Sequence, residues 1–120
     1  MALLVVEDDP DLADVLRWLL GRAGFEVATA ESGAVALCAC QTLHPELVLL
    51  DVVLPDCTGW EVYDQLRQHS AVPVIFVTAR SADRDQAQGR ALDAADYITK
   101  PFSPKELIAR VRAVLQDAAA

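Results

Sequence analysis

The fold is decided by the stretch Leu3-Leu-Val-Val-Glu-Asp-Asp9, a short apolar run that ends in three carboxylates. Three further short runs lead into a chemically active group: Leu47–Leu50 before Asp51, Val74–Val77 before Thr78, and Tyr97-Ile-Thr99 before Lys100. In an open parallel sheet the carboxyl ends of the strands lie along one edge, where ligands bind. Acids, a hydroxyl and an amine would therefore share one pocket.

Apolar runs alternate with helical patterns along the whole chain. Strands are expected at Leu3–Val6, Glu26–Thr29, Leu47–Leu50, Val74–Val77 and Asp96–Ile98. Short runs without internal charge are typical of parallel strands that are covered on both faces. Strands that alternate with helices in this way predict right-handed crossovers and a three-layer α/β domain.

Capping residues predict where the helices begin. Asp11 is the expected cap region of the first helix, and Ser32 can cap the second. A third helix is expected after Gly59, and Ser103-Pro-Lys-Glu106 has the pattern of a capping box for the last one. The segment Ser81–Leu92 has a thin apolar stripe, which predicts a marginal helix.

Composition excludes several classes of function. The formal charge is −8, from 18 acidic and 10 basic residues, and it opposes direct binding of nucleic acid by this domain. The apolar runs are far shorter than a membrane span requires. The N-terminus lacks the basic start and cleavage site of a secretory signal, so the cytoplasm is the expected location. A chain of 120 residues is predicted to form one domain, residues 1–120.

The cysteines indicate a reducing compartment. Cys38, Cys40 and Cys57 cannot all pair within the chain. Cys38 and Cys40 lie two positions apart on an expected helix and so point to different faces, which disfavours a disulfide or a shared metal. We therefore expect free thiols.

The acids predict phosphoryl transfer that depends on a cation. A carboxylate is a poor nucleophile, yet Asp51 could attack a phosphoryl donor if a cation neutralised the surrounding charge. Magnesium suits this task because it binds oxygen ligands, commonly one or two carboxylates plus phosphate oxygens. Asp8 and Asp51 are the expected direct ligands. Glu7 or Asp9 would hold a water, and a backbone carbonyl just beyond Asp51 would complete the set.

Lys100 and Thr78 complement these acids. Lys100 offers a point charge to a phosphoryl oxygen and Thr78 a hydroxyl donor, so the negative charge that develops on transfer is met from both sides. Taken singly, each residue has an ordinary structural explanation, such as an acid that caps a helix. Together, on successive strand ends, they are hard to assign to stability.

These residues resemble the receiver domains of two-component response regulators. The resemblance covers essentially the whole chain and is carried by Val5-Val-Glu-Asp-Asp9, Leu49-Leu-Asp51 with Leu54-Pro55 and Gly59, Val77-Thr-Ala79, and Asp96-Tyr-Ile-Thr-Lys-Pro-Phe102. It implies a flavodoxin-like fold, a (βα)5 domain whose five-stranded parallel sheet has the order 2-1-3-4-5. It also implies that a sensor histidine kinase phosphorylates Asp51.

The same resemblance implies a role for each site residue. In the metal site the roles are Asp8 and Asp51 as direct magnesium ligands, Glu7 through a water, and Val53 through its backbone carbonyl. In the reaction and the switch they are Asp51 as phosphoacceptor, Thr78 and Lys100 as its partners, Tyr97 as a rotating aromatic, and a cis bond between Lys100 and Pro101. Such a domain is not an enzyme, because it promotes only its own phosphotransfer and dephosphorylation.

The closing stretch, Lys100 to Arg112, most closely resembles receivers fused to winged-helix DNA-binding domains. It implies an output domain or effector outside these 120 residues, with a role in transcription. At the usual pairing face of that subgroup the chain departs from the pattern, at Gln86, Arg90, Asp93 and Ala95. A monomer or a weak, phosphorylation-dependent homodimer is therefore expected.

Three other interpretations use a similar site or fold. A haloacid-dehalogenase-like phosphatase needs a second acid two residues after the nucleophile, where this chain has Val53. A flavodoxin needs a hydroxyl- and glycine-rich loop after the first strand, where Glu7-Asp-Asp9-Pro would repel the flavin phosphate. A pseudo-receiver, a binding module of the same fold that is not phosphorylated, stays open as the alternative.

Overall fold

A computed structural model describes residues 2–78 and 94–119 of the chain. For Thr78 and for residues 118 and 119 it describes the backbone alone. The helix expected over Ser81–Leu92 lies outside the described residues, and so do the departures at Gln86, Arg90 and Asp93.

Strands and helices alternate as the apolar pattern predicts. The elements are β1 Ala2–Val6, α1 Pro10–Arg22, β2 Glu26–Ala30, α2 Gly33–Leu43, β3 Leu47–Leu50, α3 Gly59–His69, β4 Val74–Thr78, β5 Asp96–Thr99 and α5 Pro104–Ala119. Each predicted strand is confirmed to within one residue at either end. In the described part of the chain, none of the helices has the length and apolar character needed to cross a bilayer.

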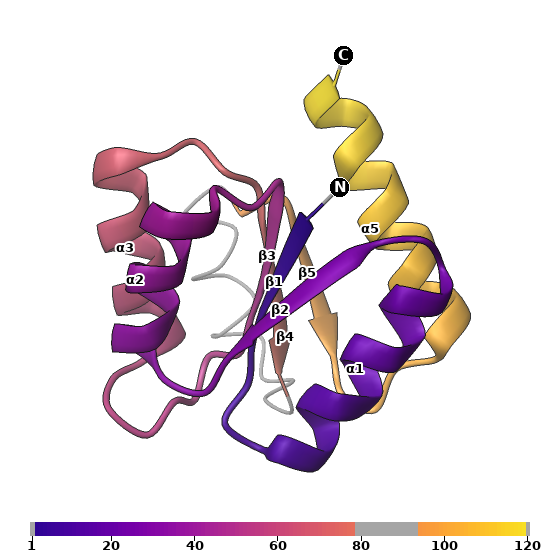
Figure 1. The fold of residues 1–120 in the computed structure, drawn as a ribbon, viewed down its shortest axis with the longest axis horizontal. Coiled ribbons are helices and arrows are strands. Elements are labelled where there is room, and N and C mark those ends of the chain that lie inside the picture. The colour runs from indigo at the N-terminus through magenta and orange to yellow at the C-terminus, as the bar shows by residue number, and fades with distance from the viewer. Residues whose placement is uncertain (1, 79–93, 120) are drawn as a thin grey trace.

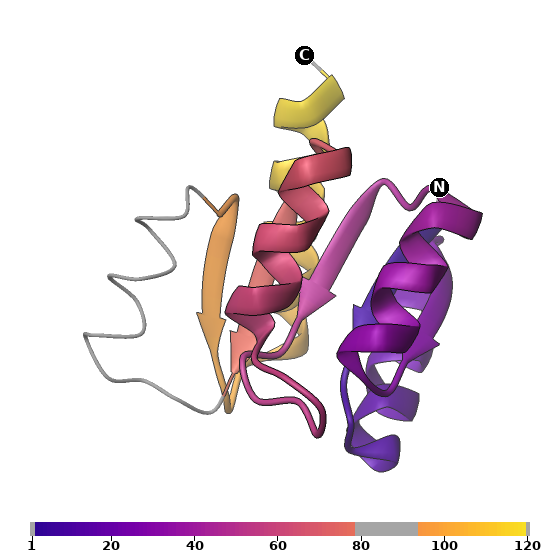
Figure 2. The same ribbon diagram turned by 90° about the vertical axis from the view of Figure 1, so that its left-hand side faces the viewer.

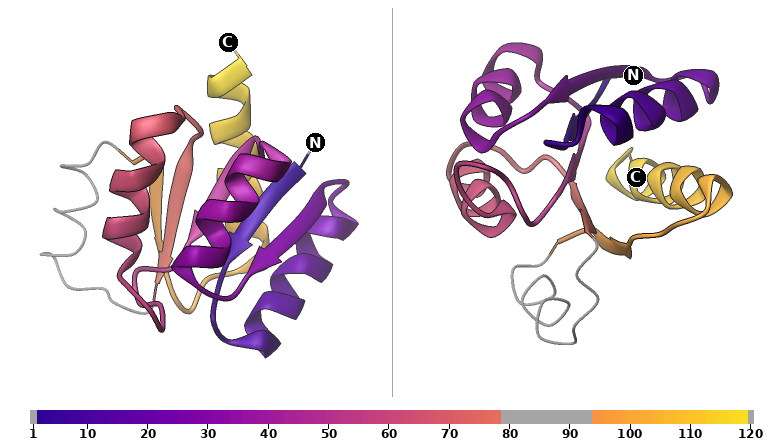
Figure 3. Two further views of the ribbon diagram at one scale, coloured as in Figure 1. Left: turned by 60° about the vertical axis from the view of Figure 1, so that its left-hand side comes forward. Right: turned by 90° about the horizontal axis from the view of Figure 1, so that it is seen from below.

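The strands form one parallel sheet in the order β2-β1-β3-β4-β5, which confirms the predicted topology. Helices α2 and α3 cover one face of this sheet, and α1 and α5 cover the other (Figure 1). The right-hand view of Figure 3, seen from below, separates the three layers, and Figure 2 views the molecule from the side on which α2 and α3 lie. The order places β1 and β3 next to each other near the middle of the sheet.

Both faces of the central strands are buried. In β1, Leu4 and Val6 pack in the layer of α2 and α3, whereas Leu3 and Val5 pack in the layer of α1 and α5. None of these four side chains is more than 1% exposed. A strand with two buried faces needs apolar residues at successive positions, which accounts for the uninterrupted runs in the sequence.

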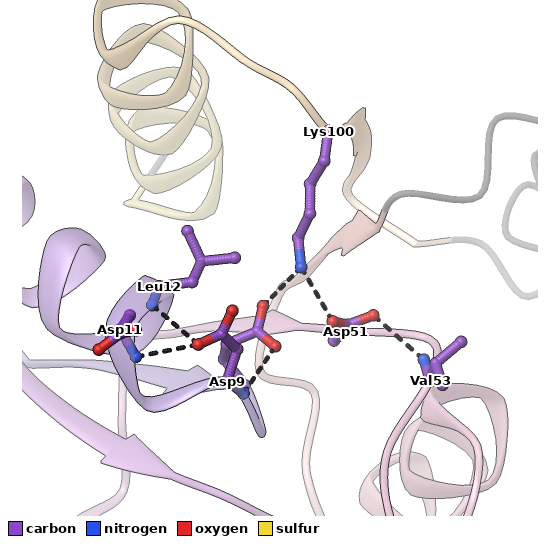
Figure 4. A network of polar contacts seen from close by, with 7 residues as sticks. Asp9, Asp11, Leu12, Asp51, Val53 and Lys100 are labelled. Carbon is purple, nitrogen blue, oxygen red and sulfur yellow. Dashed lines mark hydrogen bonds and ion pairs between the residues drawn. The ribbon is translucent and has the colours of Figure 1, made fainter.

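Asp9 caps helix α1, so the expectation that Asp11 does so is wrong. The Asp9 Oδ1 atom accepts hydrogen bonds from the backbone N–H groups of Asp11, at 3.0 Å, and Leu12, at 3.5 Å (Figure 4). Pro10 occupies the first helical position, where no N–H is required, and the cap must precede it. Only three residues, all acids, therefore separate β1 from α1.

The starts of α2 and α5 agree with the capping patterns, whereas α3 begins at Gly59 itself rather than after it. Ser32 caps α2 by accepting a hydrogen bond from the Val35 N–H at 3.2 Å. Ser103 Oγ accepts one from the Glu106 N–H at 3.0 Å at the start of α5. Thr58 caps α3, and the helix begins at the following residue. These caps fix the residue at which each helix begins after its preceding strand and loop.

Gly59 brings the first turn of α3 against the end of β3. A Cβ atom added at this position would lie 2.3 Å from the carbonyl oxygen of Asp51 and 2.9 Å from the Cα of Val52. The Gly59 N–H donates to the Val52 carbonyl at 2.7 Å. Since the obstructing atoms belong to the backbone, a side chain here would displace the end of the strand.

We expect Gly59→Ala to lower the free energy of unfolding by about 1–3 kcal/mol, the usual cost of overpacking. The matched control is Gly21→Ala in α1, where an added Cβ meets nothing within 4 Å. There the better helix propensity of alanine should stabilise the protein by up to about 1 kcal/mol. Urea unfolding of both variants checks this, and a Gly59→Ala protein as stable as the wild type would contradict the close approach.

Candidate functional site

The predicted site residues come from the ends of four strands at one edge of the sheet. Glu7 and Asp8 follow β1, Asp51 follows β3, Thr78 ends β4 and Lys100 follows β5. These four strands are consecutive neighbours in the sheet. The structure brings the side chains of the three acids and the lysine together, while for Thr78 it places the backbone at the same edge.

Lys100 joins two buried carboxylates that belong to different strands. Its Nζ atom donates to Glu7 Oε1 at 2.6 Å and to Asp51 Oδ2 at 3.0 Å. Figure 4 shows the lysine side chain extending from the end of β5 toward Asp51. Glu7 is only 5% exposed and Asp51 7%. Burying two carboxylates is costly unless a cation pairs with them, and Lys100 is that cation.

The Asp51 carboxylate has both of its oxygens engaged. Oδ2 accepts from Lys100, and Oδ1 accepts from the backbone N–H of Val53 at 3.1 Å (Figure 4). Val53 itself lies at the mouth of the site, with a side chain that is 53% exposed. The two hydrogen bonds fix the orientation of the carboxylate before any ligand binds.

Burial and pairing shift the pKa values of Glu7 and Lys100. Burial raises the pKa of Glu7, the hydrogen bond from Lys100 offsets only part of this rise, and the charge of Asp51 adds to it. Burial alone would lower the pKa of Lys100, but its hydrogen bonds to Glu7 and Asp51 and the negative charges of these two carboxylates together outweigh that effect, so the pKa is raised. Lys100 is therefore a fixed positive charge at neutral pH.

Three carboxylates are spaced to hold a metal ion. Ligand oxygens of Glu7, Asp8 and Asp51 lie within 4.8 Å of one another. Asp8 is exposed, and its carboxylate has no hydrogen bond or ion pair with any residue that the structure describes. Three carboxylates, one of which is exposed and without a described partner, fit magnesium, because this ion prefers hard oxygen ligands and retains several waters.

Asp9 does not belong to this cluster. Its carboxylate is committed to the first turn of α1, and only its backbone N–H turns toward the site, donating to Glu7 Oε2 at 3.3 Å. The sequence left either Glu7 or Asp9 as the acid that holds a water, and the structure places Glu7, not Asp9, beside Asp8 and Asp51. The cap on α1 thus orients the acid two residues before it.

Of the two residues assigned to the switch, Tyr97 packs on the side of the sheet covered by α2 and α3, and the side chain of Thr78 lies outside the described part of the structure. Tyr97 is half-buried, and its ring lies 6.4 Å from the ring of Phe76, centroid to centroid. The bond between Lys100 and Pro101 is cis. Tyr97 is therefore part of the apolar layer in this conformation.

The contact made by Asp56, which lies in the connection between β3 and α3, was not predicted from the sequence. Its two oxygens accept hydrogen bonds from the backbone N–H groups of Gly33, at 2.9 Å, and Ala34, at 3.0 Å. These bonds hold the pKa of Asp56 below its usual value. The only signal in the sequence was an acid after Leu54-Pro55, and nothing local indicated that it reaches a different helix.

Residues 3–112 match the family described as the response regulator receiver domain. The chain belongs to this family. The receiver is 48% identical over 115 residues to the sensory transduction protein RegX3 of Mycobacterium tuberculosis (strain ATCC 25618 / H37Rv), covering 96% of this chain and 51% of that protein. It is 46% identical over 114 residues to the DNA-binding response regulator MtrA of Mycolicibacterium smegmatis, covering 95% and 50%. The receiver thus spans about half the length of these relatives.

Solved structures agree with the fold of this receiver. The BeF3-activated N-terminal receiver domain of RstA from Klebsiella pneumoniae superimposes with a TM-score of 0.92 at 30% identity, covering 96% of this chain and 98% of that one. The predicted flavodoxin-like fold is confirmed. The predicted similarity to receivers of DNA-binding regulators is confirmed by the match to MtrA.

We expect Glu7→Gln to raise the stability of the metal-free protein at neutral pH. Because the folded-state pKa of Glu7 lies above its ordinary value of 4.5, the stabilising protonated form is lost as the pH rises through that raised pKa. Glutamine resembles the protonated form at every pH. Its advantage over the wild type should therefore be largest near pH 7.5 and shrink as the pH falls toward 4.5.

Urea unfolding from pH 4.5 to 8 in the presence of a chelator measures this difference. Glu26→Gln is the control, since Glu26 is an exposed acid at the start of β2. A Glu7→Gln protein that is less stable than the wild type at pH 7.5 would show that the bond to Lys100 outweighs the cost of burial.

Proposed function

We propose that this receiver domain, residues 1–120, accepts a phosphoryl group on Asp51 from a sensor histidine kinase, with bound magnesium. The proposal rests above all on one observation, the Lys100 ammonium that bridges the buried Glu7 and Asp51 beside the open acid Asp8. Cations and acids at this spacing meet the needs of phosphoryl transfer, in which positioning and charge neutralisation supply most of the catalysis.

Four residues would hold the metal. Asp8 and Asp51 would bind magnesium directly, Glu7 through a water, and Val53 through its backbone carbonyl. When bound, the ion supplies neutralisation of the charge that otherwise keeps a phosphoryl donor away from an acidic pocket. The proposal is supported by the spacing of the three carboxylates and by the open position of Asp8.

Asp51 would act as the nucleophile. One of its oxygens attacks the phosphorus of the donor's phosphohistidine, an O–P bond forms as the P–N bond breaks, and the imidazole nitrogen keeps the electron pair. The hydrogen bonds from Lys100 and Val53 orient the carboxylate for that attack. Lys100, with Thr78, would then bind the transferred oxygens and stabilise their charge.

Phosphorylation would change the conformation of the face shared by the helix expected over Ser81–Leu92, β5 and α5. The new group adds up to about two negative charges and three acceptor oxygens. It would draw Thr78 and Lys100 inward, and Tyr97 would turn into the space left behind. An output domain or effector would sense this change in the cytoplasm. Since one relative is named a DNA-binding response regulator, we propose a role in transcription, with the receiver monomeric or weakly dimeric.

Removing Asp8 should weaken magnesium binding. In a Trp18→Phe background the fluorescence of Trp60, which directly follows Gly59 at the site, reports the titration without the exposed Trp18. We expect Asp8→Asn to raise the magnesium dissociation constant by at least about tenfold, since changes even in outer-shell groups cost that much. Asp64→Asn, an exposed acid on α3, is the control. Unchanged affinity in Asp8→Asn would refute the ligand assignment.

Acetyl phosphate with magnesium should add one acid- and base-labile phosphoryl group to the wild type and none to Asp51→Ala. Mass spectrometry of the intact proteins measures this, with Asp64→Asn again as the control. Label retained by Asp51→Ala would move the nucleophile to another residue. A wild type that takes no label from acetyl phosphate or from a phosphorylated kinase would favour the pseudo-receiver.

A further inference from the structure

The connection between β3 and α3, residues 51–58 and here called the β3–α3 loop, folds back on itself. Val53 pairs with Thr58 in an isolated antiparallel bridge, and the Leu54 N–H donates to the Cys57 carbonyl at 3.3 Å. The loop therefore has a base at Asp51 and Thr58 and a tip at residues 55–57. Val53, whose carbonyl is the loop's contribution to the proposed metal site, lies on one arm between base and tip.

Asp56 fastens the tip of this loop to helix α2. Its Oδ1 accepts from the Gly33 N–H and its Oδ2 from the Ala34 N–H, the first two residues of the helix. These N–H groups have no partner within the helix and lie at the positive end of its dipole, so a carboxylate bound to both is favoured. Ser32, the helix's own cap, serves only the Val35 N–H.

Close packing reinforces the attachment. A Cβ atom added at Gly33 would lie 2.2 Å from Cys57 Sγ and 3.4 Å from Asp56 Oδ1. The absence of a side chain at this position lets the tip of the loop lie directly on the helix. The link is also remote in sequence, since 23 residues separate Asp56 from Gly33.

We propose that Asp56 is a positioning residue for the magnesium site, holding the Val53 carbonyl in place beside Asp51 by fixing the loop tip to α2. The inference rests on the proposed function, because it assumes that Val53 is a ligand. Without Asp56 the tip loses its hydrogen bonds to α2, so the arm that carries the carbonyl is held by fewer contacts and magnesium binding must supply more of its order. Pre-ordering this arm lowers the entropic cost of binding.

The coupling must be reciprocal. If the attachment of Asp56 to α2 favours magnesium binding, then magnesium binding strengthens that attachment by the same factor. The N–H groups of Gly33 and Ala34 should therefore exchange more slowly with solvent when the metal is bound. A carboxylate that merely caps a helix would show no such response to magnesium.

The decisive comparison is between Asp56→Ala and Ser32→Ala. Both remove a cap from the first turn of α2, but only the first releases the loop. We expect Asp56→Ala to weaken magnesium binding by roughly three- to tenfold, at or below the lower limit of outer-shell effects, because Asp56 is exposed. Asp56→Asn, which keeps one acceptor oxygen, should be intermediate. Ser32→Ala should lower the urea midpoint yet keep the wild-type magnesium affinity.

These affinities are measured by Trp60 fluorescence in the Trp18→Phe background, with magnesium chloride as the only ligand added. Amide exchange, followed by NMR with and without magnesium, provides the second readout. Exchange at Gly33 and Ala34 should slow with magnesium in the wild type and in Ser32→Ala, and should not respond in Asp56→Ala.

Wild-type affinity in Asp56→Ala would overturn the inference, and so would equal weakening in Ser32→Ala, since the effect would then come from the helix alone. Either result leaves the proposed function intact. Failure of the wild type to bind magnesium at all would instead overturn the proposed function, and this inference with it.

Discussion

One ammonium group between two buried carboxylates is the constraint on which the rest of this receiver depends. Lys100 lies beyond β5 at the edge of the sheet, and its partners Glu7 and Asp51 follow the two adjacent central strands. A strand order that separated β1 from β3, or placed β5 elsewhere, would leave two charges buried without a cation, at a cost of several kcal/mol for each. The topology and the chemistry of the site are thus two aspects of one electrostatic requirement.

Three adjacent acids of the same chemical type have three different environments. Glu7 is buried and paired, Asp8 is exposed without a described partner, and Asp9 is committed to the start of α1. The direction of the chain as it leaves β1 and enters α1 decides these environments. Within three residues the protein obtains a buried acid for Lys100, an open ligand and a helix cap.

The sequence was informative wherever a local rule or a shared edge determines the outcome. The central strands were predictable because burial on both faces demands uninterrupted apolar runs, and the convergence of Glu7, Asp51 and Lys100 followed from the common edge of a parallel sheet. The cap of α1 was misplaced at Asp11, although the preference of proline for the first helical position places the cap before Pro10, at Asp9. The attachment of Asp56 to α2 could not be predicted because it joins a loop to a helix that is distant in sequence, through backbone N–H groups, which every non-proline residue has.

The close approach of α3 to the end of β3 limits which sequence changes this domain can tolerate during evolution. Most steric conflicts in a core can be relieved by a smaller side chain at the neighbouring position, so paired changes open routes that single changes close. At Gly59 the obstructing atoms are the carbonyl of Asp51 and the Cα of Val52, which are present whatever residues occupy those positions. No second substitution at either neighbour can therefore restore the space. Backbone atoms alone require glycine at position 59, so a change of side chain at a neighbouring position cannot compensate for its replacement.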